Sequence, residues 1–130
     1  RQNAARLGTW NVRFVESNWY SSLDESSRFE LIVANPPYVA ENDPHLQRGD
    51  VRFEPISALT SGAEGLDAIS HIARASLDFL TVSGRLLFEH GYDQAQRCRE
   101  LLSHAGFDAV QSWPDLAGIE RVSGGRAPSL

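Results

Sequence analysis

The sequence predicts an α/β domain whose parallel sheet ends in an antiparallel hairpin. Short apolar runs of strand length alternate with longer segments whose apolar residues follow a helical period. Two strand-like runs then follow one another near the end of the chain. A length of 130 residues with 42% hydrophobic composition suffices for one packed domain and leaves little room for two.

The first half of the chain contains two expected strands. Residues 1–8 have the pattern of a helix end that stops at a glycine. Residues 11–15 alternate apolar and polar side chains, which predicts a short strand, and the polar residues 17–28 predict a loop with a helical turn. Residues 29–34 form a nearly continuous apolar run, so we expect a buried parallel strand. Residues 38–60 predict a long loop, and a loop of that length in a compact domain is usually functional or mobile.

Two helices and three strands are expected in the second half. The apolar face of the first helix consists of Leu66, Ile69, Ala73, Leu77 and Leu80. Ser83-Gly84 predicts a turn into a buried strand over residues 85–89. Residues 95–105 predict a second helix, with a glycine after its last turn. Residues 107–113 and 119–126 predict the terminal hairpin, with a turn at residues 123–126.

Composition and charge exclude several kinds of function. The 12 basic and 17 acidic side chains give a net charge of −5, which argues against a broad grip on nucleic acid. All the basic side chains are arginines, so a Schiff-base lysine and the lysine of a phosphate-binding loop are excluded. No run approaches the roughly 20 apolar residues of a membrane helix, so we expect no membrane partner.

The few cysteine, methionine and histidine residues carry further information. Cys98 is the only cysteine, which fits a reducing, cytoplasmic compartment, and its place on an apolar helix face predicts a small buried hydrophobe. His45, His71 and His104 have no metal-ligand spacing with Cys98, so we expect no metal. The sequence contains no methionine, so we expect it to be a segment of a longer protein.

The motif that carries chemistry is Asn35-Pro36-Pro37-Tyr38, directly after a predicted strand. Open α/β sheets bind ligands at the carboxyl ends of their strands. The two prolines make a stiff corner whose carbonyls need not be consumed by a following helix. The Asn35 amide adds hydrogen-bonding groups, and Tyr38 adds a flat face.

Such a corner suits a planar group that bears an NH₂. Acceptors on both hydrogens would hold the nitrogen and favour attack by its lone pair on an electrophile, so that positioning provides most of the catalysis. The alternative is a Pro-Pro turn that merely ends a strand. The asparagine before the prolines, the tyrosine after them and the strand leading in favour the functional interpretation.

Beyond this motif, the sequence resembles the HemK/PrmC family, whose members methylate the glutamine amide in the Gly-Gly-Gln motif of peptide chain release factors. The resemblance implies a Rossmann-like, S-adenosylmethionine-dependent methyltransferase fold. Other matching segments are Asp43-Pro44-His45-Leu46, Gly49-Asp50-Val51-Arg52-Phe53-Glu54-Pro55, Ala58-Leu59, the residues 83–91 and Glu120-Arg121-Val122.

The resemblance also implies roles for individual residues. Asn35 and the Pro36 carbonyl would hold the glutamine amide, with Pro37 completing the corner and Tyr38 packing against the substrate. Asn18, Trp19 and Asn35 are the residues expected to bind S-adenosylmethionine, which leaves as S-adenosylhomocysteine. Asn18 replaces the acidic residue that the family places near the adenine.

The loop residues Arg52, Phe53 and Glu54 are candidates for release-factor recognition. An ion pair between Arg52 and Glu54 that holds the loop shut, with Phe53 as a packing anchor, is the structural alternative.

The match begins after the part of the family fold that carries the glycine-rich cofactor loop. The resemblance therefore implies a partial fold, the C-terminal portion of one methyltransferase domain, without the first two strands and the N-terminal helical domain. We expect the intact parent to be the enzyme and the isolated segment to be inactive, with weak cofactor binding. Unpaired strand edges could let the segment associate with a second copy.

Three alternatives to a release factor methyltransferase stay open. An adenine-amino DNA or RNA methyltransferase could use the same corner on an exocyclic amine, although the charge balance is unfavourable. A related enzyme that methylates a ribosomal-protein glutamine differs mainly in the residues 52–55. The segment as given could also be an inactive fragment or a binding module.

Overall fold

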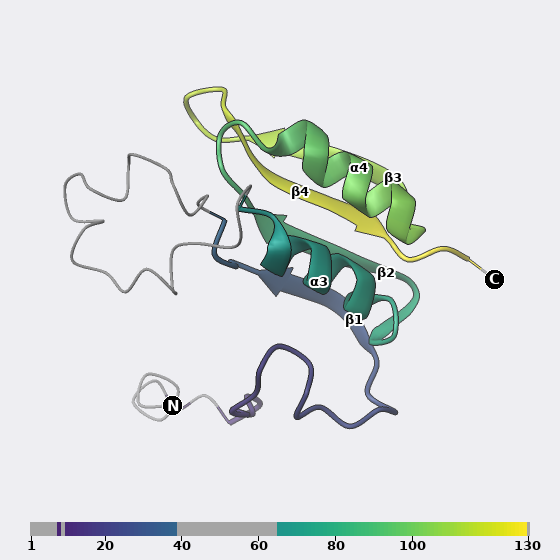
Figure 1. Ribbon diagram of the computed structural model, residues 1–130. Coiled ribbons are helices and arrows are strands. Elements are labelled where there is room, and N and C mark those ends of the chain that lie inside the picture. The colour runs from purple at the N-terminus through teal and green to yellow at the C-terminus, as the bar shows by residue number, and fades with distance from the viewer. Residues whose placement is uncertain (1–7, 9, 39–64, 130) are drawn as a thin grey trace.

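A four-stranded sheet with two helices on one face forms the fold (Figure 1). The computed structural model describes residues 8, 10–38 and 65–129. The expectations for residues 1–7 and for the loop over residues 39–64 lie outside this part of the chain. The described elements are β1 (Phe29–Ala34), α3 (Asp67–Ser76), β2 (Leu80–Glu89), α4 (Ala95–Ala105), β3 (Asp108–Pro114) and β4 (Glu120–Arg126).

The strand order is β1-β2-β4-β3, so the last strand of the chain lies between β2 and β3. β1 and β2 are parallel, as expected for two strands joined through a helix. β4 is antiparallel to both β2 and β3. The predicted parallel pair followed by a terminal antiparallel hairpin is therefore confirmed.

The core lies between the sheet and the two helices. Its fully buried side chains include Ile69 and Ile72 of α3, Leu86 and Phe88 of β2, and Cys98 and Leu102 of α4. The helix predicted over residues 95–105 is confirmed. Gly106 ends it with φ 105°, a left-handed conformation that glycine adopts readily, and its N–H bonds back to the carbonyls of Leu102 and Ser103.

The expected burial of β1 is wrong. Ile32 and Ala34 pack against the core, but Leu31 and Val33 are 53% and 68% exposed. A continuous apolar run predicts a strand that is covered on both faces. In the described part of the chain, α3 and α4 lie on the same side of the sheet, and no helix covers the other side (Figure 1).

The strand expected over residues 11–15 is also absent. Val12, Phe14 and Val15 are 44–45% exposed, and the segment is an irregular coil. A strand is stable only when a neighbour satisfies its backbone groups. β1 is the edge of the described sheet, so residues 11–15 form no ladder with it. The turns expected over residues 17–28 are present.

Two boundaries in the sheet differ from expectation. Leu80 belongs to β2 and not to the helix, and Ser83-Gly84 forms an irregularity inside that strand, with Ser83 at φ 62°. Gly124 and Gly125 lie within β4 and not in a turn. A Cβ on Gly124 would lie 2.3 Å from the Leu86 carbonyl oxygen, so a close approach of two backbones explains this glycine.

Replacing Leu86 tests whether this core holds the fold. Leu86→Ala removes a fully buried side chain from the central strand, so we expect the free energy of unfolding to fall by about 2–5 kcal/mol. Leu116→Ala makes the same chemical change at a fully exposed turn position and should change it by less than about 0.5 kcal/mol. Urea unfolding of both variants gives the comparison, and equal losses would contradict the packing described here.

Cys98 gives an independent probe of the same core. Burial raises the pKa of its thiol to about 12, so it stays protonated and shielded at neutral pH. We expect iodoacetamide to leave the native chain unmodified and to alkylate it fully in concentrated urea. Mass spectrometry measures both states, and rapid alkylation of the native chain would show that Cys98 of α4 is not buried in the core.

Candidate functional site

The carboxyl ends of the two parallel strands meet at one edge of the sheet. Ala34, the last residue of β1, is paired with Phe88 of β2. The corner Asn35-Pro36-Pro37-Tyr38 and the segment 89–91 therefore leave the sheet side by side. This is the edge at which open α/β sheets bind their ligands.

The four residues of the corner differ in burial. Pro36 is among the fully buried residues, and Pro37 and Tyr38 are half-buried. Asn35 is exposed, and no hydrogen bond to its side chain is present among the described residues. The prolines thus pack into the protein while the Asn35 amide remains available to a ligand.

Tyr38 is held at both ends by residues from the neighbouring strand end. Its hydroxyl donates a hydrogen bond to Oε1 of Glu89 at 3.0 Å. Its carbonyl accepts one from Nε2 of Gln94 at 2.8 Å. Burial raises the pKa of Tyr38, the hydrogen bond and charge of Glu89 raise it further, and Arg121 opposes them. The ring is therefore a neutral, fixed surface beside Asn35.

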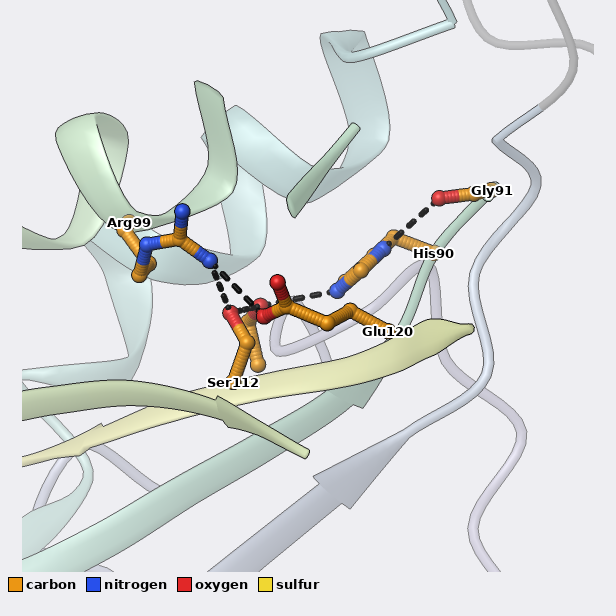
Figure 2. A network of polar contacts seen from close by, with 6 residues as sticks. His90, Gly91, Arg99, Ser112 and Glu120 are labelled. Carbon is orange, nitrogen blue, oxygen red and sulfur yellow. Dashed lines mark hydrogen bonds and ion pairs between the residues drawn. The ribbon is translucent and has the colours of Figure 1, made fainter. Parts of the chain in front are cut away.

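A chain of polar contacts supports the segment that follows β2 (Figure 2). His90 is fully buried, and its Nδ1 lies 2.9 Å from the Gly91 carbonyl oxygen while its Nε2 lies 2.7 Å from Oγ of Ser123. Ser123 continues to Ser112 at 2.6 Å. Arg99 of α4 then contacts both Ser112 at 2.8 Å and the Glu120 carboxylate at 2.9 Å.

The donors and acceptors in this series of hydrogen bonds can be assigned consistently. The Gly91 carbonyl can only accept, so Nδ1 of His90 carries the proton and Nε2 accepts from Ser123. Ser112 then donates to Ser123 and accepts from Arg99. With this assignment every hydroxyl hydrogen in the chain has an acceptor. Both ring nitrogens of His90 therefore bond to the protein itself, which makes His90 a structural residue.

The start of β4 approaches the same edge. The His90 N–H donates to the Arg121 carbonyl at 2.9 Å. The Arg121 guanidinium lies 6.0 Å from the ring centroid of Tyr92 and 3.5 Å from the Asp115 carboxylate. The segment Glu120-Arg121-Val122, which carried part of the family resemblance, therefore lies beside the candidate site.

Of the residues expected to bind the cofactor, Asn35 belongs to the corner, but Asn18 and Trp19 are not brought to it. Tyr20 stacks on Phe79 with ring centroids 4.9 Å apart, and its hydroxyl contacts Ser76. Phe79 comes directly before Leu80, which pairs with Phe29 at the start of β1. The stacked Tyr20 and Phe79 rings therefore lie near the start of β1, whereas Asn35 follows its end. Asn18 and Trp19, just before Tyr20, are exposed, and Asn18 lines an open depression with Glu16, Ser17 and Ser22.

The other expected site residues and the expected absences can be checked only in the described part of the chain. Arg52, Phe53 and Glu54 lie outside the described residues. In the described part of the chain, no group of three or more His, Cys, Asp or Glu side chains is arranged to hold a metal ion. None of the described helices combines the length and the apolar character that crossing a membrane requires.

Sequence reasoning missed Gln94 and Tyr20, although both organise this region. Gln94 is a polar residue at a helix start, where a solvent-exposed side chain is the ordinary expectation. Tyr20 lies in a polar segment without apolar periodicity. The one available signal for Gln94 was its position three residues after Gly91, at the strand end where ligands bind.

Comparison with known proteins identifies the family of this chain. No protein-family model matches the chain. A protein of Burkholderia pseudomallei named release factor glutamine methyltransferase is 54% identical over 117 residues, which cover 90% of this chain and 41% of that protein. Proteins of the same name from Vibrio cholerae and Bordetella pertussis are 48% and 50% identical and cover 97% and 95% of this chain.

The chain belongs to the HemK/PrmC family. It matches a C-terminal part of these relatives and spans less than half of their length, with 41%, 44% and 45% of the three proteins covered. A crystal structure of a methyltransferase from Pyrococcus furiosus has a TM-score of 0.66 at 18% identity, with 99% of this chain and 55% of that chain covered. This likeness confirms a partial Rossmann-like methyltransferase fold.

The burial of Tyr38 and its contact with Glu89 predict a pH effect in this HemK/PrmC chain. Folding raises the Tyr38 pKa, so the folded state binds the phenol proton more tightly than the unfolded state does. The resulting stability is complete below the ordinary tyrosine value of 10.0 and is lost as the pH rises through the folded-state value. We therefore expect the free energy of unfolding to decline less steeply above pH 10.0 in Tyr38→Phe than in the unchanged chain.

Urea unfolding between about pH 8 and about pH 11 measures these slopes. Tyr92→Phe is the matched control, because its side chain is 58% exposed. Equal slopes for Tyr38→Phe and the unchanged chain would contradict the burial of the Tyr38 hydroxyl.

Proposed function

We propose that the full-length protein carrying this sequence transfers a methyl group from S-adenosylmethionine to the side-chain amide nitrogen of the Gly-Gly-Gln glutamine in peptide chain release factors. The observation that carries this proposal is an exposed Asn35 on a corner fixed at the carboxyl edge of β1 and β2. The names of the relatives support the substrate, because they describe glutamine methyltransferases acting on release factors.

The corner suits the acceptor amide of that reaction. The amide nitrogen is a weak nucleophile because its lone pair is delocalised into the carbonyl. Asn35 offers an acceptor oxygen to one of its hydrogens, and the Pro36 carbonyl is proposed to accept the other. Tyr38, fixed through Glu89 and Gln94, would keep the amide plane in place. The chain's contribution is then orientation of the nucleophile, which requires no strong base beforehand.

The described residues do not make a complete site for the methyl donor. Asn18 and Trp19 are exposed and anchored through Tyr20 toward the opposite end of β1 from Asn35. No step through the donor is therefore derived from this geometry. We propose that the segment alone binds S-adenosylmethionine weakly, and calorimetry that detected tight binding would contradict this.

A transfer assay tests the function and its alternatives together. The full-length protein is incubated with S-adenosylmethionine labelled in its methyl group and with one of four acceptors. These are a release factor, the same factor with its Gly-Gly-Gln glutamine replaced, a ribosomal protein fraction and duplex DNA. Label on the first acceptor alone is the expected result. Label on DNA or on the ribosomal fraction would assign one of the alternative substrates instead.

Replacing Asn35 tests its proposed role. Because Asn35 is exposed, we expect Asn35→Ala in the full-length protein to change the free energy of unfolding by less than about 0.5 kcal/mol. The lost positioning should lower turnover by about 100-fold or more. Asn11→Ala, the same change at another exposed asparagine, is the control and should leave turnover unchanged. Normal turnover in Asn35→Ala would remove the residue from the mechanism.

A further inference from the structure

Gln94 connects three backbone segments through one buried side chain. It is 6% exposed and occupies the N-cap position of α4. Its Oε1 accepts a hydrogen bond from the Gly91 N–H at 2.7 Å. Its Nε2 donates to the Tyr38 carbonyl at 2.8 Å and lies 3.5 Å from the Gly65 carbonyl oxygen. The side chain thus connects Gly91 after β2, Tyr38 at the end of the corner and Gly65 just before α3.

The packing around this side chain leaves little room for adjustment. A Cβ on Gly65 would lie 2.1 Å from the Tyr38 carbonyl oxygen and 2.8 Å from Nε2 of Gln94. Gly65 also has a φ of 75°, which favours glycine. A Cβ on Gly91 would lie 3.1 Å from Oε1 of Gln94 and 3.5 Å from the Tyr38 ring. Glycines on two sides therefore let the Gln94 amide approach the backbone closely.

The chemistry of the contact requires an amide. Gly91 presents a donor, whereas Tyr38 and Gly65 present acceptors, so the side chain must accept at one atom and donate at the other. A glutamate of the same length would keep the bond from Gly91 but would lose the donor to Tyr38. Its charge would suit the start of a helix. The two ends of Gln94 can therefore be tested separately.

We infer that Gln94 is a positioning residue for the Asn35-Pro36-Pro37-Tyr38 corner, acting through the Tyr38 carbonyl. The inference rests on the proposed glutamine methylation. Glu89 fixes the hydroxyl end of Tyr38 and Gln94 fixes its backbone end, so the ring and the corner keep one orientation. Loss of the Gln94 donor releases one of these two attachments and leaves the composition of the corner unchanged.

The decisive variant is Gln94→Glu in the full-length protein, with Gln96→Glu as the matched control. Gln96 lies two residues further along the same helix end, is exposed, and its side-chain amide donates a hydrogen bond to Glu100. We expect Gln94→Glu to lower the melting temperature, because a buried carboxylate oxygen then faces the Tyr38 carbonyl. Assayed well below that melting temperature, it should lower kcat on a release factor by about 10- to 100-fold. KM for the release factor should change little. Gln96→Glu should match the unchanged protein.

A purely structural role for Gln94 predicts a different result. If the side chain served only to bond Gly91 and cap the turn, glutamate would replace it and kcat would be normal. Normal kcat in Gln94→Glu, with label still transferred by the unchanged protein, overturns the positioning role alone. Absence of label from the unchanged protein overturns the proposed function instead.

Two NMR measurements on the 130-residue chain need no activity, and the first of them needs no variant. We expect the Gln94 side-chain amide protons to exchange with solvent more slowly than those of Gln96, because the former are buried in hydrogen bonds. We also expect Gln94→Glu, and not Gln96→Glu, to shift the carbonyl ¹³C resonance of Tyr38. Equal exchange rates, or an unmoved Tyr38 resonance, would show that Gln94 does not hold the corner.

Discussion

The buried hydrogen bond between His90 and Ser123 is the contact on which the candidate site depends. His90 follows β2, and Ser123 lies in β4, so the bond fastens the carboxyl end of β2 to the terminal hairpin. Ser112 and Arg99 extend it to β3 and α4 (Figure 2). A buried imidazole with unpaired nitrogens would be costly, so the position of the segment 89–91 is specified by where these partners lie. Glu89 and Gly91, the neighbours of His90, carry that position to Tyr38.

The sequence predicted the helical side of the fold better than the sheet. α4 could be predicted from Cys98, Leu102 and Gly106. The signals for a helix, the spacing of its apolar residues and a glycine at its end, lie close together in the sequence. Strands depend on partners that are distant in the sequence. Residues 11–15 alternate like a strand but have no described neighbour to pair with, and Gly124-Gly125 looks like a turn because its close contact with β2 is not local.

The same distinction applies to the site. The corner could be recognised because four consecutive residues carry its chemistry, and its position at the strand end is confirmed. Gln94 could not be recognised, since its proposed positioning role depends on a hydrogen bond to Tyr38, which lies 56 residues earlier in the chain. The cofactor roles of Asn18 and Trp19 rest on a resemblance to a fold whose first two strands precede the matched segment. Tyr20, stacked on Phe79, anchors their segment in the described chain instead.

Within the corner, some residues stabilise the fold and another is available for a ligand. Pro36 is buried and Tyr38 is bonded at both ends, so these residues contribute to the fold whether or not a ligand is present. The Asn35 side chain is exposed and forms no hydrogen bond among the described residues, so it contributes little to the fold. Its backbone is nevertheless restricted by the following proline. When the Asn35 amide binds a second amide, it gives up water and breaks no contact within the protein. Because its backbone is already ordered, this binding costs little conformational entropy. In the proposed function, the rigid neighbours of Asn35 would let its exposed side chain select one orientation of the substrate amide.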